Sequence, residues 1–121
     1  MNVESYNSRG LGMDSSVREV HNLVQKHAPT VLCVVETQLH KVRVEGPASR
    51  LGFDKSFAIS STGRSGGLDI FWNNNINVEI LPYSQYHIDA VVTIGGEVPW
   101  RLTCVYGEAN TAQNLGDVEV Y

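Results

Sequence analysis

The stretch TVLCVVETQLHK, from Thr30 to Lys41, decides the fold. Five apolar residues run from Val31 to Val35 and are followed directly by an acid, Glu36. A continuous apolar run rich in β-branched residues is typical of a strand that is covered on both faces. A solvated strand end would explain the acid, and so would a metal ligand held at the mouth of a sheet. This stretch alone leaves both interpretations open.

A strand and a helix precede this run. Residues 2–7 alternate as in a strand, and residues 15–27 place apolar side chains at helical spacing until Pro29 ends the pattern. Strand, helix and strand within 36 residues form a βαβ unit, whose two strands are parallel. Asn7 and Glu36 should therefore lie side by side at the carboxyl edge of the sheet, where α/β folds bind ligands.

Strand patterns dominate the rest of the chain. Residues 37–52 are polar and mixed, which suggests a loop with room for a short helix. The turn-rich stretch 61–67 and the pair Gly95-Gly96 predict turns between strands. The strands themselves are expected at 53–60, 68–73, 77–84, 87–94 and 100–107. The predicted fold class is α/β (α+β), with one βαβ unit followed by an antiparallel meander.

Length and composition limit the classes of protein to which the chain can belong. A chain of 121 residues makes one small domain or part of a larger one, and 42% hydrophobic with 18% charged residues is typical of a globular chain. We expect the domain to span 1–107 and the weakly patterned residues 108–121 to form a polar tail. The net charge of −4 lacks the basic footprint of a nucleic-acid binder, although bound cations can offset acidic charge.

Cysteine usage and hydropathy indicate the compartment. Cys33 and Cys104 each lie within an apolar run, which favours buried free thiols over a disulfide. Residues 1–12 do not resemble a signal peptide, and no apolar run approaches the roughly 20 residues that cross a bilayer. We expect an intracellular protein, nuclear or cytoplasmic, with no membrane partner.

Further polar residues could serve a ligand site. Tyr106 ends the last strand, and its hydroxyl could contact a phosphate, although most tyrosines at such positions are half-buried core residues. Arg64 and Ser65 belong to a glycine-bearing loop that could approach a phosphate or form a plain hairpin. His87 begins a strand and shares a face with Asp89, which fits an acid/base pair or a hydrogen-bonded histidine at the edge of the core.

A nucleotide-binding alternative rests on the loop after the first strand. Gly10 and Gly12 match two positions of G-x-G-x-x-G, Ser15 occupies the third, and Glu36 follows 21 residues later, near where an acid would bind a ribose hydroxyl. The second half of the chain, however, does not continue the βα alternation of a Rossmann-like module. The motif also gives Asn7 no role.

Five segments point to a family when they are taken in order: SYNSRGLG, VREVHNLVQKHAPTVLCVVETQL, LGFDKSFAISSTGRSGGLDIFW, YSQYHIDAVV and WRLTCVYG. Together they resemble the amino-terminal half of the endonuclease/exonuclease/phosphatase family. Within it, the chain is most similar to the apurinic-endonuclease-like domain of plant LINE-type (non-LTR) retrotransposons. The resemblance covers residues 1–107 and implies part of a four-layered α/β sandwich.

The resemblance also implies a function. Its activity would be magnesium-dependent cleavage of a phosphodiester, nicking DNA to prime reverse transcription. Asn7 matches the asparagine that ends the first strand of the family, and Glu36 matches the Mg²⁺-binding glutamate. Tyr106 matches the tyrosine that contacts the region of the scissile phosphate. Arg64, Ser65 and His87 are candidates for contacts to the DNA substrate.

The departures from the family are as informative as the matches. Arg9 stands where the wider family often has an acid, and the later Gly-Asp-Phe-Asn and Asp-His motifs have no counterpart in the chain. The stretch Gly116 to Glu119 lies too early to replace them. We therefore expect a truncated domain that is inactive by itself, with an apolar sheet face left uncovered and open to self-association. A nuclease completed by a dimer or a partner chain is the alternative.

Overall fold

A computed structural model describes residues 2–8, 10–11, 14–35, 37, 45–59, 67–84, 87–105 and 111–114. The elements follow in the order β1 (Val3–Asn7), α1 (Asp14–His27), β2 (Val31–Val35), α2 (Glu45–Leu51), β3 (Lys55–Ile59), β4 (Leu68–Trp72), β5 (Ile76–Ile80), β6 (His87–Ile94), β7 (Trp100–Val105) and β8 (Thr111–Asn114).

The βαβ unit predicted from the sequence is present. Strands β1 and β2 are parallel neighbours, with Val3 opposite Val31 and Asn7 opposite Val35. Helix α1 connects them and buries Val17 and Val20. An acid in its first turn and two basic residues in its last turn suit the helix dipole. The carboxyl ends of β1 and β2 therefore lie together.

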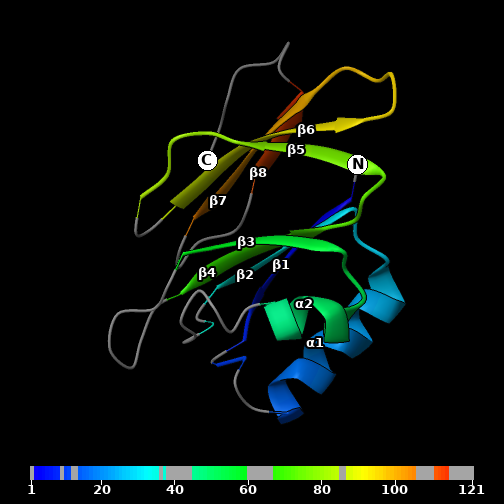
Figure 1. Cartoon of the computed structure of the whole chain (residues 1–121), viewed down its shortest axis with the longest axis vertical. Coiled ribbons are helices and arrows are strands. Elements are labelled where there is room, and N and C mark those ends of the chain that lie inside the picture. Colours follow the sequence, from blue (N-terminus) through cyan, green and yellow to red (C-terminus); the bar gives the residue numbers. More distant parts are fainter. Residues whose placement is uncertain are drawn as a thin grey trace.

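The predicted meander is divided between two sheets. The first sheet has the order β1-β2-β4-β3 and the second the order β5-β6-β7-β8. All described pairs other than β1–β2 are antiparallel. The chain leaves the first sheet through the short connection at residues 73–75, so that the consecutive strands β4 and β5 belong to different sheets. Figure 1 shows the resulting layers: the second sheet, the first sheet, and then the two described helices.

Most strands lie within a residue or two of their predicted bounds, and β5 and β8 differ most from the sequence prediction. Strand β5 ends at Ile80, although the pattern predicted a strand to residue 84. The backbone N–H of Leu81 still donates to the carbonyl of Asp89 over 2.9 Å, but Pro82 has no N–H with which to continue the ladder. Strand β8 lies within the stretch expected to be a polar tail and pairs with β7. Its sequence, TAQN, has no apolar alternation from which a strand could be predicted.

Two apolar cores hold the layers together. The core between the first sheet and the helices includes residues from α1, β2 and α2, among them Val20, Val34 and Leu51. The core between the two sheets includes residues from β2, β4, β6 and β7. Strands β2 and β4 contribute to both cores, and every residue of each is buried. This confirms that the run Val31–Val35 is covered on both faces.

The outer face of the second sheet is polar, contrary to the expected apolar face. None of the described helices covers it (Figure 1). The described side chains of β5, β6 and β7 that alternate with the core positions are mostly hydrophilic, with two valines among them. They are Asn77, Glu79, His87, Asp89, Val91, Thr93, Arg101, Thr103 and Val105. Strict alternation along these strands places the apolar set inward, and self-association of the chain stays a prediction.

Candidate functional site

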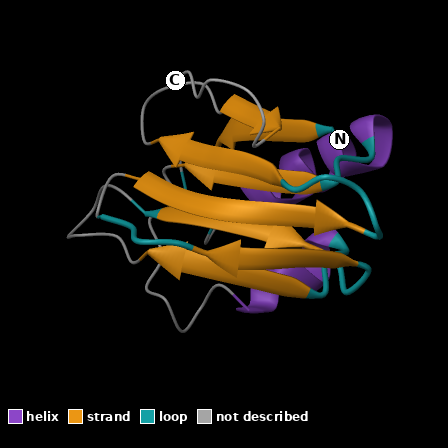
Figure 2. Cartoon of the chain, turned by 90° about the horizontal axis from the view of Figure 1, so that it is seen from above, coloured by secondary structure: helices purple, strands orange, loops and turns teal. Residues whose placement is uncertain are grey.

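Several described strand ends lie together at one end of the sandwich. Because only residues 73–75 separate Trp72 from Ile76, the end of β4 and the start of β5 lie at the same end of the two sheets. The opposite ends of these strands, at Leu68 and Ile80, therefore lie together at the other end. Figure 2 shows the strands of both sheets running in roughly the same line, so this relation extends across the layers.

The other strands follow by register. Asn7 and Val35 end β1 and β2 beside Leu68, since Val35 pairs with both Asn7 and Leu68. In the second sheet His87, which begins β6, pairs with Val105, which ends β7. We call this end of the sandwich the site rim. It is the left side of Figure 1.

Backbone hydrogen bonds tie the segments of the site rim to one another. The N–H of Ser8 donates to the carbonyl of Val35 over 3.1 Å, and that of Leu11 donates to Thr37 over 2.8 Å. The N–H of Thr37 in turn donates to Gly67 over 3.3 Å. These bonds continue the pairing of β1, β2 and β4 past the ends of the strands. Ser8 and Thr37 are buried, so the backbone at this edge of the sheet is held in place.

Several predicted site residues lie outside the residues that the structure describes. The strand ends next to them in the sequence are described. Glu36 directly follows Val35, and Tyr106 directly follows Val105. Arg64 and Ser65 fall in the connection from β3 to β4, which starts and ends at the site rim. Asn7 is the last residue of β1, with an exposed side chain. The described strand ends that flank these residues thus all lie at the site rim.

His87 has a partner that the sequence did not indicate. Its Nδ1 lies 2.6 Å from the hydroxyl oxygen of Ser84, and the N–H of Ser84 donates to the carbonyl of His87 over 3.0 Å. Ser84 is exposed and lies at the site rim, just before β6. Asp89, which shares a face with His87, instead accepts from Arg101 at 3.0 Å and from Thr103 at 2.6 Å. These contacts therefore favour a hydrogen-bonded histidine over an acid/base pair of His87 and Asp89.

A buried acid escaped the analysis of the sequence. Asp69 is wholly buried on β4, between Val34 of β2 and Ala58 of β3. Neither carboxylate oxygen has a hydrogen-bond partner. Burial raises the pKa of Asp69 well above the usual value, since a charged carboxylate would lose its hydration in this apolar layer. One acid within the apolar run LDIFW was the signal available in the sequence.

A magnesium site is not apparent among the described side chains. No group of three or more His, Cys, Asp or Glu that could hold a metal occurs in the ranges that the structure describes. The oxygen and nitrogen groups of Asn7, Ser84 and His87 at the site rim are compatible with phosphate and its hydrated cation. Among the residues predicted for the site, Glu36 is the one that carries a carboxylate. Magnesium commonly keeps several waters and needs only one or two carboxylates, so such a donor set fits its chemistry.

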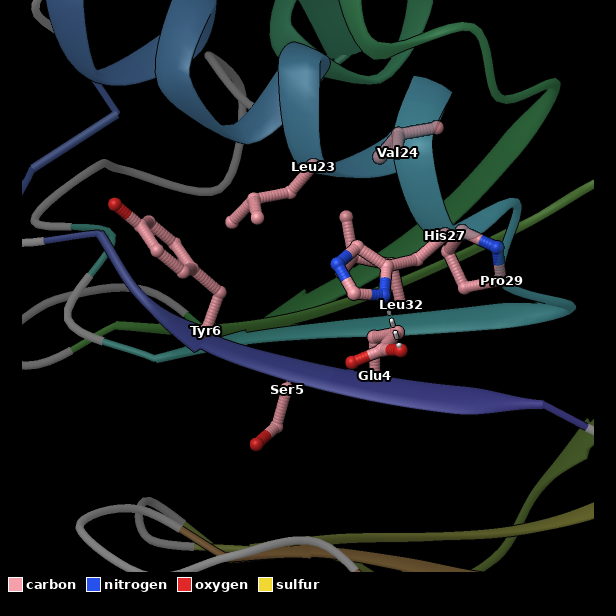
Figure 3. Close-up of a pocket in the computed structure, with 8 residues that line it drawn as sticks. All are labelled: Glu4, Ser5, Tyr6, Leu23, Val24, His27, Pro29 and Leu32. Carbon is pink, nitrogen blue, oxygen red and sulfur yellow. Dashed lines mark ion pairs between the residues drawn. The ribbon is translucent and has the colours of Figure 1, made fainter.

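A small pocket lies away from the site rim. It is formed by β1, the second half of α1 and the start of β2, has a volume of about 30 Å³, and lies beside the ion pair of Glu4 and His27 at 3.3 Å. Figure 3 shows Leu23 and Val24 of α1 above Tyr6 and Leu32. A space of this size holds about one water molecule. It is too small for a nucleotide.

The architecture identifies a class. A parallel β1–α1–β2 unit, an antiparallel extension by β4 and β3, and a second antiparallel sheet packed on the first make a partial sandwich of the endonuclease/exonuclease/phosphatase type, also called DNase I-like. No protein-family model and no curated protein matches the sequence. The similarity of this chain to known proteins is a similarity of fold to solved structures.

Three solved structures illustrate it. An AP endonuclease from Leishmania major has a TM-score of 0.58 and 14% identity, over 86% of this chain and 39% of its own. An AP endonuclease from Archaeoglobus fulgidus has a TM-score of 0.56 and 20% identity, over 79% of this chain and 38% of its own. A 3′ phosphatase from Neisseria, bound to product DNA, has a TM-score of 0.55 and 16% identity, over 88% and 41%.

These neighbours show the fold of the chain and its extent. All three belong to the AP endonuclease and exonuclease-phosphatase group, and the chain spans about two fifths of the length of each. At identities of 14 to 20% the likeness concerns the fold alone.

No described helix is long and apolar enough to span a membrane.

Proposed function

We propose that this chain carries the metal-binding side of a magnesium-dependent phosphodiesterase site that acts on DNA. The observation that carries the proposal is the parallel register of β1 and β2, which places Asn7 opposite Val35, the residue directly before Glu36. In the proposed site an amide and an acid come from these neighbouring strands to one rim. Carboxylate oxygen is a preferred ligand of Mg²⁺, and an amide can donate to a phosphate oxygen.

Magnesium would act as a Lewis acid on the phosphate and neutralise developing charge. In the proposed site Glu36 holds the cation, Asn7 orients the acid or the phosphate, and Tyr106 contacts the phosphate. Arg64, Ser65 and the Ser84–His87 pair approach the DNA backbone from neighbouring segments of the site rim. The solved 3′ phosphatase of similar fold is bound to DNA, which supports DNA as the substrate class.

We further propose that these 121 residues do not cleave DNA by themselves. A phosphodiesterase needs a group that assists the nucleophile and one that stabilises the phosphate. The resemblance places those groups in Gly-Asp-Phe-Asn and Asp-His motifs that the chain does not contain. Binding of magnesium and cleavage of DNA are therefore expected to separate in this chain.

Descent from a plant LINE-type retrotransposon is part of the same proposal. It is supported by the order of the five segments that resemble that domain, over residues 1–107. Reading the nucleotide sequence past the codon of Tyr121 tests it. An out-of-frame Gly-Asp-Phe-Asn segment there would support decay of a longer enzyme, whereas unrelated coding sequence of another fold would contradict it.

The nucleotide-binding alternative finds no support in the fold. A Rossmann-like module needs a parallel sheet that continues by βα alternation. Here β1–β2 is the one parallel pair among the described strands, and β4 joins β2 antiparallel. We do not pursue it.

Magnesium binding tests the proposed site. The melting temperature of the wild-type chain should rise with added Mg²⁺, because a ligand that binds only the folded state stabilises it. Glu36→Gln should abolish the rise, while Glu97→Gln, in the turn at the far end of β6 from the site rim, should preserve it. An equal rise in Glu36→Gln would show that the cation binds elsewhere.

A plasmid-nicking assay tests the second half of the proposal. The wild-type chain with Mg²⁺ should leave supercoiled plasmid intact. Robust nicking that Glu36→Gln abolishes would refute inactivity while supporting the phosphodiesterase site. Size-exclusion chromatography of a nicking-competent sample would then show whether the active species is a dimer.

A further inference from the structure

A groove between the two described helices is lined mainly by basic side chains. Helices α1 and α2 lie side by side over the first sheet (Figure 1) and contribute to the same apolar core. The groove has a volume of about 320 Å³, and its described lining consists of Val17, Arg18, His21 and Arg50. Val17 is buried, whereas both arginines are exposed. The groove therefore combines one buried apolar residue with basic side chains that solvent can reach.

Helical spacing and one ion pair bring these basic groups together. Arg18 and His21 are three residues apart on α1, and residues at this spacing are neighbours on the surface of a helix. Asp14 lies four residues before Arg18 and so belongs to the same face of α1. The carboxylate of Asp14 is 3.1 Å from the guanidinium of Arg50. Arg50 of α2 therefore reaches the part of α1 that carries Arg18.

The positive charge of the groove is only partly neutralised. Its described lining contains two arginines and no acid, in a chain whose net charge is −4. Arg50 pairs with Asp14, but the side chains of this pair are 53% and 79% exposed, so water screens their attraction. Arg18 makes no ion pair with any residue that the structure describes. A guanidinium without an ion pair thus lies beside a weakly paired one, which is an arrangement that attracts an anion.

We propose that the groove between α1 and α2 is a binding site for a phosphate group, either as the free ion or as the monoester of a small molecule. Arginine binds phosphate through two parallel N–H···O hydrogen bonds. A phosphate dianion also carries the charge that balances the guanidinium groups of Arg18 and Arg50. His21 adds a ring N–H, which a neutral imidazole provides as well. The ligand replaces the carboxylate of Asp14 on Arg50.

The composition of the groove indicates a compact anion rather than a large organic ligand or a nucleic acid. Pockets for drug-sized ligands have volumes of about 300–1,000 Å³ and are lined mainly by apolar and aromatic side chains. This groove lies at the lower end of that range, and Val17 is the one apolar residue in its described lining. The net negative charge of the chain opposes the approach of a polyanion. A single phosphate group interacts mainly with the charges close to it, because salt screens the more distant ones.

The test titrates the whole chain with sodium phosphate in magnesium-free buffer at constant ionic strength. Heteronuclear NMR signals of the arginine side chains report on the groove, and they should shift in a saturable manner in the millimolar range. Arg18→Gln and Arg50→Gln should each weaken binding by about tenfold or more, because each removes hydrogen bonds between charged groups. Lys26→Gln makes the same change of charge in the last turn of α1 and should leave the affinity as it is.

Asp14 provides a second variant, whose effect has the opposite sign. Asp14→Asn removes the carboxylate that competes for Arg50, so the affinity for phosphate should rise by about two- to fivefold. Glu97→Gln makes the same change of net charge in the turn between β6 and β7 of the second sheet, and it should give no such rise.

Glycerol phosphate distinguishes the two sources of the phosphate group. Tighter binding of this ester than of free phosphate assigns the groove to phosphorylated small molecules, and the reverse order assigns it to the free ion. Wild-type affinity in both Arg18→Gln and Arg50→Gln would overturn the proposal, as would weaker binding in Asp14→Asn. Arginine signals that respond to a short DNA duplex and not to phosphate would also overturn it. The described lining of the groove contains no residue proposed for the site rim, so the two sites are tested separately.

Discussion

At the scale of single residues, Asp69 is the least compatible with its surroundings. A carboxyl group without a hydrogen-bond partner in an apolar layer loses its hydration and gains nothing in return. The residues opposite Asp69 on the neighbouring strands, Val34 and Ala58, are buried and apolar. The thiols of Cys33 and Cys104 lie on the other side of the sheet. Burial therefore raises the pKa of Asp69 well above its usual value.

This predicts a particular dependence of stability on pH. The folded state binds the proton of Asp69 more tightly than the unfolded state, in which the pKa is near 3.8. The contribution of Asp69 to the free energy of unfolding is therefore fully present below that value and is lost as pH rises through the raised folded pKa. The free energy of unfolding, measured by urea unfolding from acid to alkaline pH, should fall with rising pH in the wild type relative to Asp69→Asn.

The size of the effect and its control can be stated. At neutral pH the apolar Asp69→Val should be more stable than wild type by about 1–3 kcal/mol, since it removes an unsatisfied buried group. Asp14→Asn, which changes a carboxylate whose side chain is 79% exposed, is the control. If the free energy of unfolding of Asp69→Asn had the same pH dependence as that of the wild type, the raised pKa of Asp69 in the folded state would be contradicted.

At the scale of elements, the outer face of the second sheet is held by a polar cluster. Asp89 of β6 accepts hydrogen bonds from Arg101 and Thr103 of β7, and its side chain is only 13% exposed. The cluster replaces the apolar face expected from the sequence. It joins the two central strands of this sheet where no described helix covers them.

Removal of this acid should destabilise the sheet. Asp89→Ala leaves a partly buried Arg101 without its carboxylate, and we expect a loss of about 2–3 kcal/mol in the free energy of unfolding. The exposed pair of Asp14 and Arg50, 3.1 Å apart, is the matched comparison. Asp14→Ala should cost less than about 1 kcal/mol. Equal losses in the two variants, measured by urea unfolding, would contradict the role given to burial.

At the scale of the whole molecule, two cores share one sheet. Strands β2 and β4 face the helices on one side and the second sheet on the other. Loss of either core exposes a face of these strands, so neither core should persist alone. The described layers should therefore unfold as one cooperative unit.

Two variants test this cooperativity. Val20→Ala removes methyl groups from the core under the helices and Val92→Ala from the core between the sheets, each at a cost of about 2 kcal/mol. Tryptophan fluorescence reports on the core between the sheets, because Trp72 belongs to it and Trp100 packs against it. Far-ultraviolet circular dichroism reports on helix α1. Both probes should follow one transition in both variants, and a separate early loss of helix in Val20→Ala would show two independent units.

The predictions made from the sequence succeeded where signals are local. The periodicity of residues 15–27 predicted α1, and the run Val31–Val35 predicted a strand buried on both faces. The parallel pairing of β1 with β2 followed from their connection by a helix, and Asn7 came to the predicted edge. Glu36, Tyr106, Arg64 and Ser65 lie outside the described residues, so their roles stay predictions.

The sequence by itself determined the βαβ unit and the position of most strands, because helix and strand periods depend on residues close together in the chain. Tertiary structure alone decided that β4 and β5 part into different sheets, that Asp69 lies without a hydrogen-bond partner, and that Cys33 and Cys104 belong to one core. Each of these outcomes depends on which apolar faces pack together across long separations in sequence. No local pattern encodes that choice.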